Sequence, residues 1–248
     1  MIRRYFIGVV ILTSAVIQDC FAAEENSLDY FVDLGMSSKQ MELTIRDRKF
    51  EADFMTLDLA FTVAYGKFFA TVTYEPSLKD DVRSDGSGLI FYSREDTTLT
   101  AGMSVFKGMS VFGGYRFGTT SGYYSASNGE SLVESEGIFA GVSYSKSVAD
   151  KGSAVVSLAI AQLSGTVSVN EPFVDRTAIP TAPNEVDGDA LGYSFGLRWV
   201  GQLGELSSYN VGLKIHRYEF EDQENFGGLD LSFTEDFTSI SAGITRYF

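Results

Sequence analysis

The feature that most constrains this chain is an alternation of large apolar side chains with small or polar ones. In residues 55–65, MTLDLAFTVAY, every second side chain is large and apolar, and those between are threonine, aspartate or alanine. The same pattern appears in 192–199, GYSFGLRW, and in 209–216, YNVGLKIH. A period of two places alternate residues on opposite faces of a β-strand. The sequence therefore predicts strands with one face of large apolar side chains and one face of small or polar side chains.

Runs of this kind recur along the chain, with connections that alternate in length. They lie near residues 28–45, 50–65, 67–77, 94–106, 109–119, 131–146, 152–166, 188–201, 206–221 and 231–248. Short turns such as YGK and GQLGE alternate with polar segments near 78–93, 119–131, 167–187 and 222–230, and only the first connection, RDRK (46–49), breaks this order. The pattern predicts an all-β protein, an antiparallel up-and-down transmembrane β-barrel with ten strands and one domain over residues 23–248. An eight-stranded barrel is the alternative if the first or fourth hairpin does not form.

The composition of the two faces bears on which of them meets the surroundings. In a water-soluble barrel or sandwich the apolar face turns inward. Here the polar face is rich in Gly, Ala, Ser and Thr, which crowd well into a narrow lumen. The apolar face ends in aromatic residues, for example Tyr65, Tyr74, Tyr144 and Trp199, as expected of a girdle at a membrane interface. We therefore expect the apolar face to meet lipid, with a soluble secreted β-protein as the alternative.

The first residues have the organisation of a secretory signal peptide. Arg3 and Arg4 precede an apolar run that ends near Ile17, and small residues follow at 22 and 23. The run is shorter than the roughly 20 apolar residues of a membrane-spanning helix. We expect residues 1–22 to be a leader, whose cleavage would also remove Cys20, the only cysteine. Asp19 stands where a lipoprotein processing site has a small residue, so a lipid anchor is not expected.

The chain is strongly acidic. Its formal charge is −14, and it becomes −15 when Arg3, Arg4 and Asp19 leave with the leader. Nucleic acid would be repelled by such a protein, so it is not an expected partner.

The last strand, TSISAGITRYF, ends on an aromatic residue, and Ile240 and Ile244 share its face. Such a strand must pair with the first one, because an open edge in lipid leaves backbone groups unsatisfied. In this respect the chain resembles the Gram-negative outer-membrane β-barrel proteins, whose last amphipathic strand ends in a Phe that the barrel-assembly machinery recognises. The resemblance implies an integral outer-membrane location, an assembly signal at Ile240, Ile244 and Phe248, and lipid, lipopolysaccharide and that machinery as partners. Arg246 departs from the pattern, because its position usually holds an apolar or aromatic residue, and its side chain could snorkel to the periplasmic head groups.

Charged residues of both signs lie on the polar face and are expected in the lumen. They are Asp33, Asp58, Glu75, Arg116, Arg198, Lys214 and the single histidine, His216. In a narrow barrel such charges are expected to pair, because unpaired charges in a confined space are costly. The sequence thus favours a structural barrel or a narrow channel for ions or small polar solutes over a large porin. A surface protein that binds an unidentified extracellular ligand through the segments near 78–93 and 167–187 is the alternative.

Three smaller candidates complete the sequence-based predictions. Arg46, Arg48 and Lys49 are candidates to contact lipopolysaccharide phosphates, or they form an ordinary charged hairpin tip. Asp187 and Asp189 lie in one of two acidic clusters that either bind Ca²⁺ or are simply solvated.

A catalytic role for His216 has precedents in outer-membrane phospholipases and omptin-type proteases. LKIHRYEF, however, lacks a serine or carboxylate two residues away on the same face, which leaves Asp187 and Asp189 as the best distant partners. We expect no enzyme and no cofactor, with a rim hydrolase as a further alternative.

Overall fold

The computed structural model describes residues 28–45, 48–79, 81–84, 89–124, 129–148, 151–169, 185–222 and 233–248. The expected leader, Arg46 and the middle of each long connection lie outside these ranges. No helix long and apolar enough to cross a membrane occurs among the described residues.

The described chain is almost entirely β-structure. Its strands are β1 (Leu28–Ile45), β2 (Arg48–Tyr65), β3 (Phe68–Lys79), β4 (Asp81–Ser84), β5 (Leu89–Phe106), β6 (Met109–Tyr124), β7 (Gly129–Ser147), β8 (Ser153–Val169), β9 (Glu185–Gly204), β10 (Ser207–Asp222) and β11 (Phe233–Tyr247).

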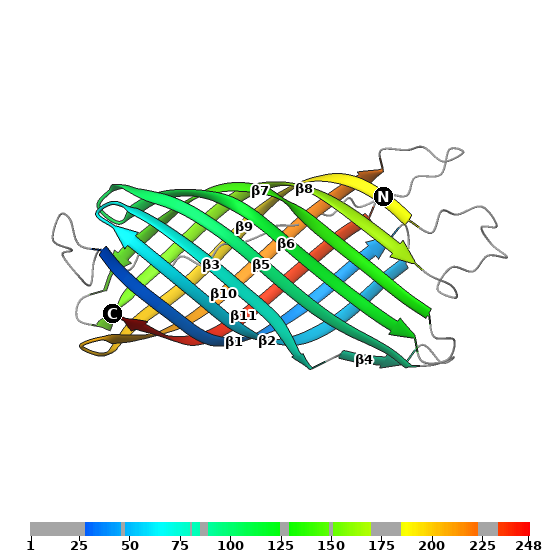
Figure 1. Ribbon diagram of the computed structural model, residues 1–248, viewed down its shortest axis with the longest axis horizontal. Helices are drawn as coiled ribbons and strands as arrows, with labels where there is room; N and C mark the ends of the chain where they lie inside the picture. The colour runs from blue at the N-terminus through cyan, green and yellow to red at the C-terminus, as the bar shows by residue number, and fades with distance from the viewer. Residues whose placement is uncertain are drawn as a thin grey trace.

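These strands form one closed, antiparallel, up-and-down barrel, shown in Figure 1. Each main strand pairs with its sequence neighbours, and closure comes from β1 against β11, with Gly35 opposite Gly243. The short β4 pairs only with β5 among the described strands and continues the wall position of β3. The barrel therefore has ten wall positions. The ten-stranded prediction is confirmed, and the eight-stranded alternative is wrong.

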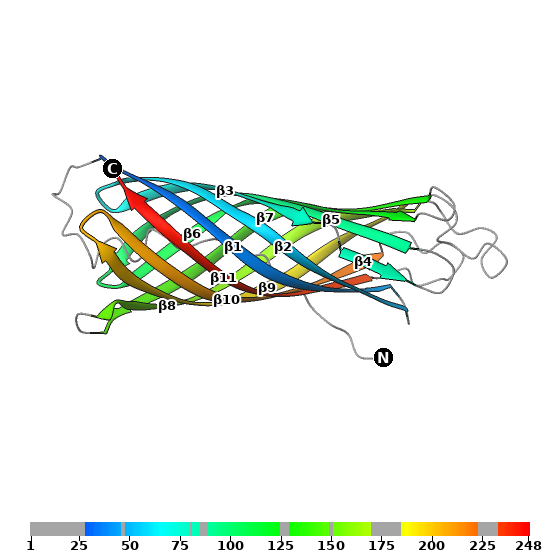
Figure 2. The same cartoon turned by 90° about the horizontal axis from the view of Figure 1, so that it is seen from below.

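The short turns gather at one end of the barrel, where β1 begins and β11 ends (Figure 2). Gly66 and Gly108 occupy turn positions with φ of 56° and 75°, which glycine adopts without the steric cost of a Cβ atom. A Cβ atom at Gly108 would also lie 2.3 Å from the backbone oxygen of Ser145. The sequence predicted short turns at one end of the barrel and long connections at the other, and the structure has this arrangement.

Several strands run further toward the long connections than the sequence indicated. β5 begins at Leu89 rather than near 94, and β6 continues to Tyr124 rather than ending near 119. Outside the membrane the outer face of a strand does not need to be apolar. Residues there still alternate between the inner and outer faces, but large apolar side chains no longer show this in the sequence. On β6, for example, Ser121 is exposed and Gly122 is buried.

The outer face is divided into an apolar belt and an acidic upper wall. On β7, Ile138 and Val142 are exposed in the belt, while Glu134 and Glu136 are exposed just beyond it. The belt covers the half of the barrel nearer the short turns, where Tyr65 and Tyr144 are exposed as the girdle prediction requires. An exposed apolar surface that encircles the whole barrel is the surface that faces lipid.

The lumen is filled by side chains in three layers. The layer nearest the long connections is apolar and includes Phe54, Phe220 and Phe233, of which the last two stack at 4.2 Å between ring centroids. The layer nearest the short turns also contains aromatic rings, with Phe31 packed edge-on against Tyr247. Charged and hydroxyl side chains lie between these two layers.

Candidate functional site

The middle of the lumen holds a layer of ten charged side chains. The acidic members are Asp33, Asp58, Glu75, Asp96 and Glu235, and the basic members are Lys39, Arg94, Arg116, Arg198 and Lys214. The formal charges of these side chains cancel, although the whole chain carries −14. We call this set the charged layer.

Asp96 is the centre of the charged layer. Its two carboxylate oxygens accept hydrogen bonds from Lys39, Arg94 and Arg116 at distances of 2.7 to 3.0 Å. Asp96 is 5% exposed. Burial removes the hydrating water of this carboxylate, which costs free energy. Direct, charge-assisted hydrogen bonds from three cations offset that cost.

Arg94 extends the network toward the apolar layer. Besides its two bonds to Asp96, it donates to Glu235 at 2.7 Å and to the Thr120 hydroxyl at 2.6 Å. Its guanidinium also lies 4.1 Å from the centre of the Phe237 ring. Glu235 is fully buried and Arg94 is 1% exposed, so this pair is sealed from solvent.

Glu75 joins the network to the short-turn side. It pairs with Lys39 through one carboxylate oxygen and with Lys214 through the other, the latter at 3.3 Å. Arg116 donates to the Tyr218 hydroxyl at 2.7 Å, which attaches the network to β10. The contacts form a continuous path from Lys214 to Glu235 through the interior of the barrel.

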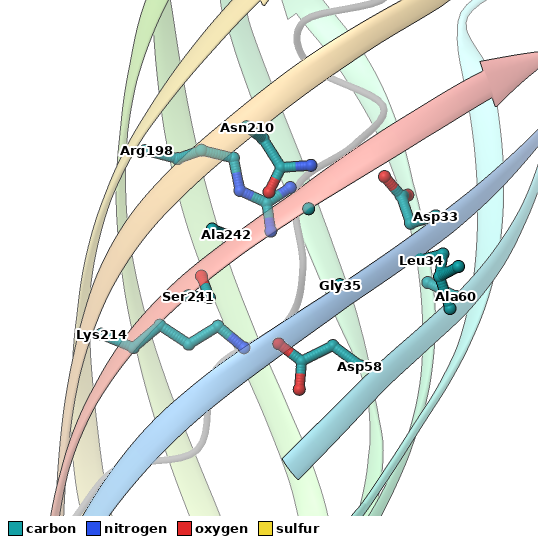
Figure 3. Close-up of a pocket in the computed structure, with 11 residues that line it drawn as sticks. Asp33, Leu34, Gly35, Asp58, Ala60, Arg198, Asn210, Lys214, Ser241 and Ala242 are labelled. Carbon is teal, nitrogen blue, oxygen red and sulfur yellow. The ribbon is translucent and has the colours of Figure 1, made fainter. Parts of the chain in front are cut away.

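Asp33, Asp58 and Arg198 lie beside this path around a small cavity (Figure 3). Asp33 accepts a hydrogen bond from Thr245, and Asp58 accepts hydrogen bonds from Ser37 and Thr56, each at 3.0 Å. The Arg198 side chain extends from β9 toward the interior, and no carboxylate lies within ion-pair distance of it in the part of the chain that the structure describes.

His216 lies on the inner face of β10, next to the charged layer. It is 7% exposed, and its ring meets Phe237 edge-on at 5.9 Å. Its strand register places it opposite Ser194, while Asp189 lies opposite Glu221. Asp187 and Asp189 point to the outer face, where they accept hydrogen bonds from Thr166 and Ser164. The suggested approach of these aspartates to His216 therefore does not occur.

The remaining sequence-based candidates lie on the outside of the barrel or at its edge. Lys49 is exposed and pairs with Glu42 at 2.8 Å, and Arg48 begins β2. Ile240, Ile244 and Phe248 are all exposed on the outer face of the last strand. No group of three or more metal-ligating side chains was found over the described ranges, which include Asp187 and Asp189.

Sequence inspection missed four members of the charged layer: Lys39, Arg94, Asp96 and Glu235. Each sits in a polar stretch, such as SSKQM or SREDTTL, where apolar neighbours do not mark the outer face. Extending the parity of Leu99 back along its strand would have placed Arg94 and Asp96 inside.

Known structures with a similar backbone are outer-membrane barrels. The outer membrane protease OmpT from Escherichia coli matches with a TM-score of 0.56 and 9% identity, covering 90% of this chain and 97% of that chain. The translocator domain of the autotransporter NalP from Neisseria meningitidis matches with a TM-score of 0.53 and 13% identity, covering 94% and 92%. No protein-family model and no curated protein matches the sequence.

At these identities the likeness shows the fold alone, and that fold is the one predicted from the alternating strand pattern. Together with the apolar belt, this fold is that of an integral membrane β-barrel, as in the outer-membrane proteins that it matches.

Proposed function

We propose that the protein is a structural barrel of the outer membrane whose lumen is closed to ions and solutes. The observation that carries this proposal is the continuous network of the charged layer, in which Asp96 binds three cations at once. An open pore needs hydrated charges along a continuous path. Here the network side chains, such as Lys39, Arg94 and Asp96, are buried, and they bind one another instead of water.

The apolar layer adds a second barrier. Phe54 and Phe220 are 1% and 0% exposed, and they lie between the charged layer and the long connections. An ion that crossed this layer would lose its hydration without gaining a partner, which costs far more than thermal energy. Of the two alternatives that the sequence left open, a structural barrel thus has more support than a narrow channel.

The test is conductance of the refolded mature protein in a planar bilayer, with insertion verified by resistance of the barrel to added protease. We expect no discrete current steps. As a positive control, a variant in which Lys39, Arg94 and Asp96 are replaced by Ser, and Phe54 and Phe220 by Ala, opens both layers and should give small steps. Reproducible steps from the unaltered protein would overturn the proposal and favour the narrow channel.

A second candidate function is binding of a partner outside the membrane. The observation that favours it is the acidic upper wall, where Glu134, Glu136, Asp187, Asp189 and Glu221 are exposed beyond the apolar belt. Strands of 16 to 20 residues exceed the roughly 9 to 11 needed to cross a bilayer, so this wall stands clear of it. A cationic partner would be attracted to such a surface.

This candidate is tested by replacing residues 170–184 with a short Gly-Ser turn and, separately, by changing Glu134 and Glu136 to Gln. Binding of intact cells to a cationic surface polymer should fall in the glutamine variant and fall further with added salt. Equal binding by both variants and the unaltered protein would exclude the wall and the segment as binding sites.

Assembly, lipopolysaccharide contact and catalysis have unequal support. The exposed positions of Ile240, Ile244 and Phe248 suit an assembly signal, and an exposed Lys49 suits contact with lipopolysaccharide phosphates. The rim hydrolase has little support, because His216 is buried and Asp187 and Asp189 lie on the opposite face of the wall. Unchanged hydrolysis of lipid and peptide substrates by a His216→Ala variant would exclude it.

A further inference from the structure

The cavity beside Arg198 lies in the half of the lumen nearer the short turns. It measures about 20 Å³ and is lined by Asp33, Asp58, Arg198, Asn210 and Ser241, together with wall residues of β1, β2 and β11. Gly35 and Gly243 face each other where β1 pairs with β11, and neither has a side chain that would fill the cavity. Figure 3 shows the Arg198 and Asn210 side chains extending from β9 and β10 into this space.

Several polar atoms around the cavity have no hydrogen-bond partner in the described part of the protein. Asp33 uses one carboxylate oxygen for Thr245, but its Oδ2 atom has no donor, and the Ser241 hydroxyl has neither donor nor acceptor. Both side chains are 7% exposed. A buried polar atom without a partner is costly, so such atoms in native proteins normally bind something.

The same half of the lumen contains other buried hydroxyls of this kind. They are Thr73, Thr100, Ser143 and Ser145, all within the short-turn half of their strands. Asp33 and Ser241 therefore belong to a wider set of unsatisfied polar atoms on that side.

We infer that the cavity is a binding site for a cluster of one or two ordered water molecules that links Arg198 to Asp33 and Ser241. Arg198 is thereby held in a water-separated ion pair, in contrast to the direct ion pairs of Arg94 and Arg116. This site is additional to the closed lumen of the proposed function and does not depend on it.

The size and chemistry of the cavity favour water over an ion. A volume of about 20 Å³ holds one or two water molecules and is too small for phosphate or a carboxylate. Two carboxylates and two cations, Asp33 and Asp58 with Arg198 and Lys214, line it, so their formal charges cancel and neither a cation nor an anion is favoured. Water both donates and accepts, and it can serve the Arg198 N–H groups and the Asp33 oxygen together.

The experiment measures exchange of arginine Nε–H protons with water by NMR, in the refolded barrel labelled with ¹⁵N-arginine. Arg94 is the internal reference, because its Nε–H donates directly to Asp96 at 3.0 Å. We expect the Arg198 Nε–H to exchange at least about tenfold faster, and to show a cross peak to water that Arg94 lacks. An Arg198→Lys variant assigns the signal.

Substitution at the cavity gives the matched test. Ser241→Val fills the site and should slow Arg198 exchange, while Ser241→Ala leaves room for water and should not. Ser143→Val, at a buried hydroxyl in the same half of the lumen that does not line the cavity, is the control for the same chemical change. Slow exchange at Arg198 in the unaltered protein, or no response to Ser241→Val, would overturn the inference. Conductance of the unaltered barrel would contradict only the proposed function.

Discussion

Asp96 is the residue on which the charged layer most depends, because Lys39, Arg94 and Arg116 all bind it. In an Asp96→Asn variant the amide keeps the shape but loses the charge, and three buried cations lose a shared partner. We expect the free energy of unfolding to fall by about 3 to 5 kcal/mol. The measurement is urea denaturation of the refolded barrel, followed by the shift between folded and unfolded bands in gels run without heating.

Glu95→Gln is the control for that prediction. Glu95 precedes Asp96 on β5 but is exposed on the outer face, so its loss should change stability by less than about 0.5 kcal/mol. Equal effects of the two variants would mean that the network contributes nothing specific.

The sequence predicted that five of these charged side chains point into the lumen, and in the structure they do. They are Asp58, Glu75, Arg116, Arg198 and Lys214. Parity along a strand is enough to assign a face. It cannot say which charges meet, because Arg94 and Glu235 come from β5 and β11, on well separated parts of the wall. Pairing across a lumen depends on barrel width, strand register and side-chain length together.

Among the strands, packing of the apolar layer depends on a glycine of β8 that leaves space for an aromatic ring of β10. Phe220 of β10 lies over Gly165 of β8, and a Cβ atom built on that glycine would come within 2.3 Å of the ring. Gly165→Ala should push Phe220 from its stacked position on Phe233 and lower the free energy of unfolding by about 1 to 3 kcal/mol.

The double variant Gly165→Ala with Phe220→Leu separates this clash from a general effect of alanine in the strand. The smaller leucine leaves space for the new methyl group, so the double variant should lose less stability than the two single changes summed. Simple additivity in urea denaturation would show that the ring and the glycine do not interact.

The ends of β5 and β6 beyond the apolar belt were not predicted, although the first strand was predicted over its full length. Beyond the belt, β5 and β6 continue with mostly polar outer residues such as Ser93 and Ser121, and sequence inspection assigned these residues to long connections. Gly122 is buried between exposed Ser121 and Tyr123. Residues there still alternate between the inner and outer faces of the wall, but their hydropathy does not show it.

At the scale of the whole molecule, the last residue both closes the barrel and carries the expected assembly signal. The Phe248 backbone exchanges two hydrogen bonds with Tyr30 at the start of β1, at 3.0 and 3.5 Å, while its side chain is 72% exposed. The backbone thus serves closure, and the ring is available for recognition. Removing Phe248 should therefore act differently in cells and in purified protein.

In cells, the protein without Phe248 should show a marked loss of folded barrel from the outer membrane, because the assembly machinery no longer recognises the strand. Refolded from denaturant, the same protein should lose less than about 2 kcal/mol, since only two exposed-end hydrogen bonds are removed. Arg246→Leu, which restores an apolar residue at an exposed position, should leave assembly intact. Equal losses in cells and in refolded protein would assign Phe248 a purely structural part in closing the barrel.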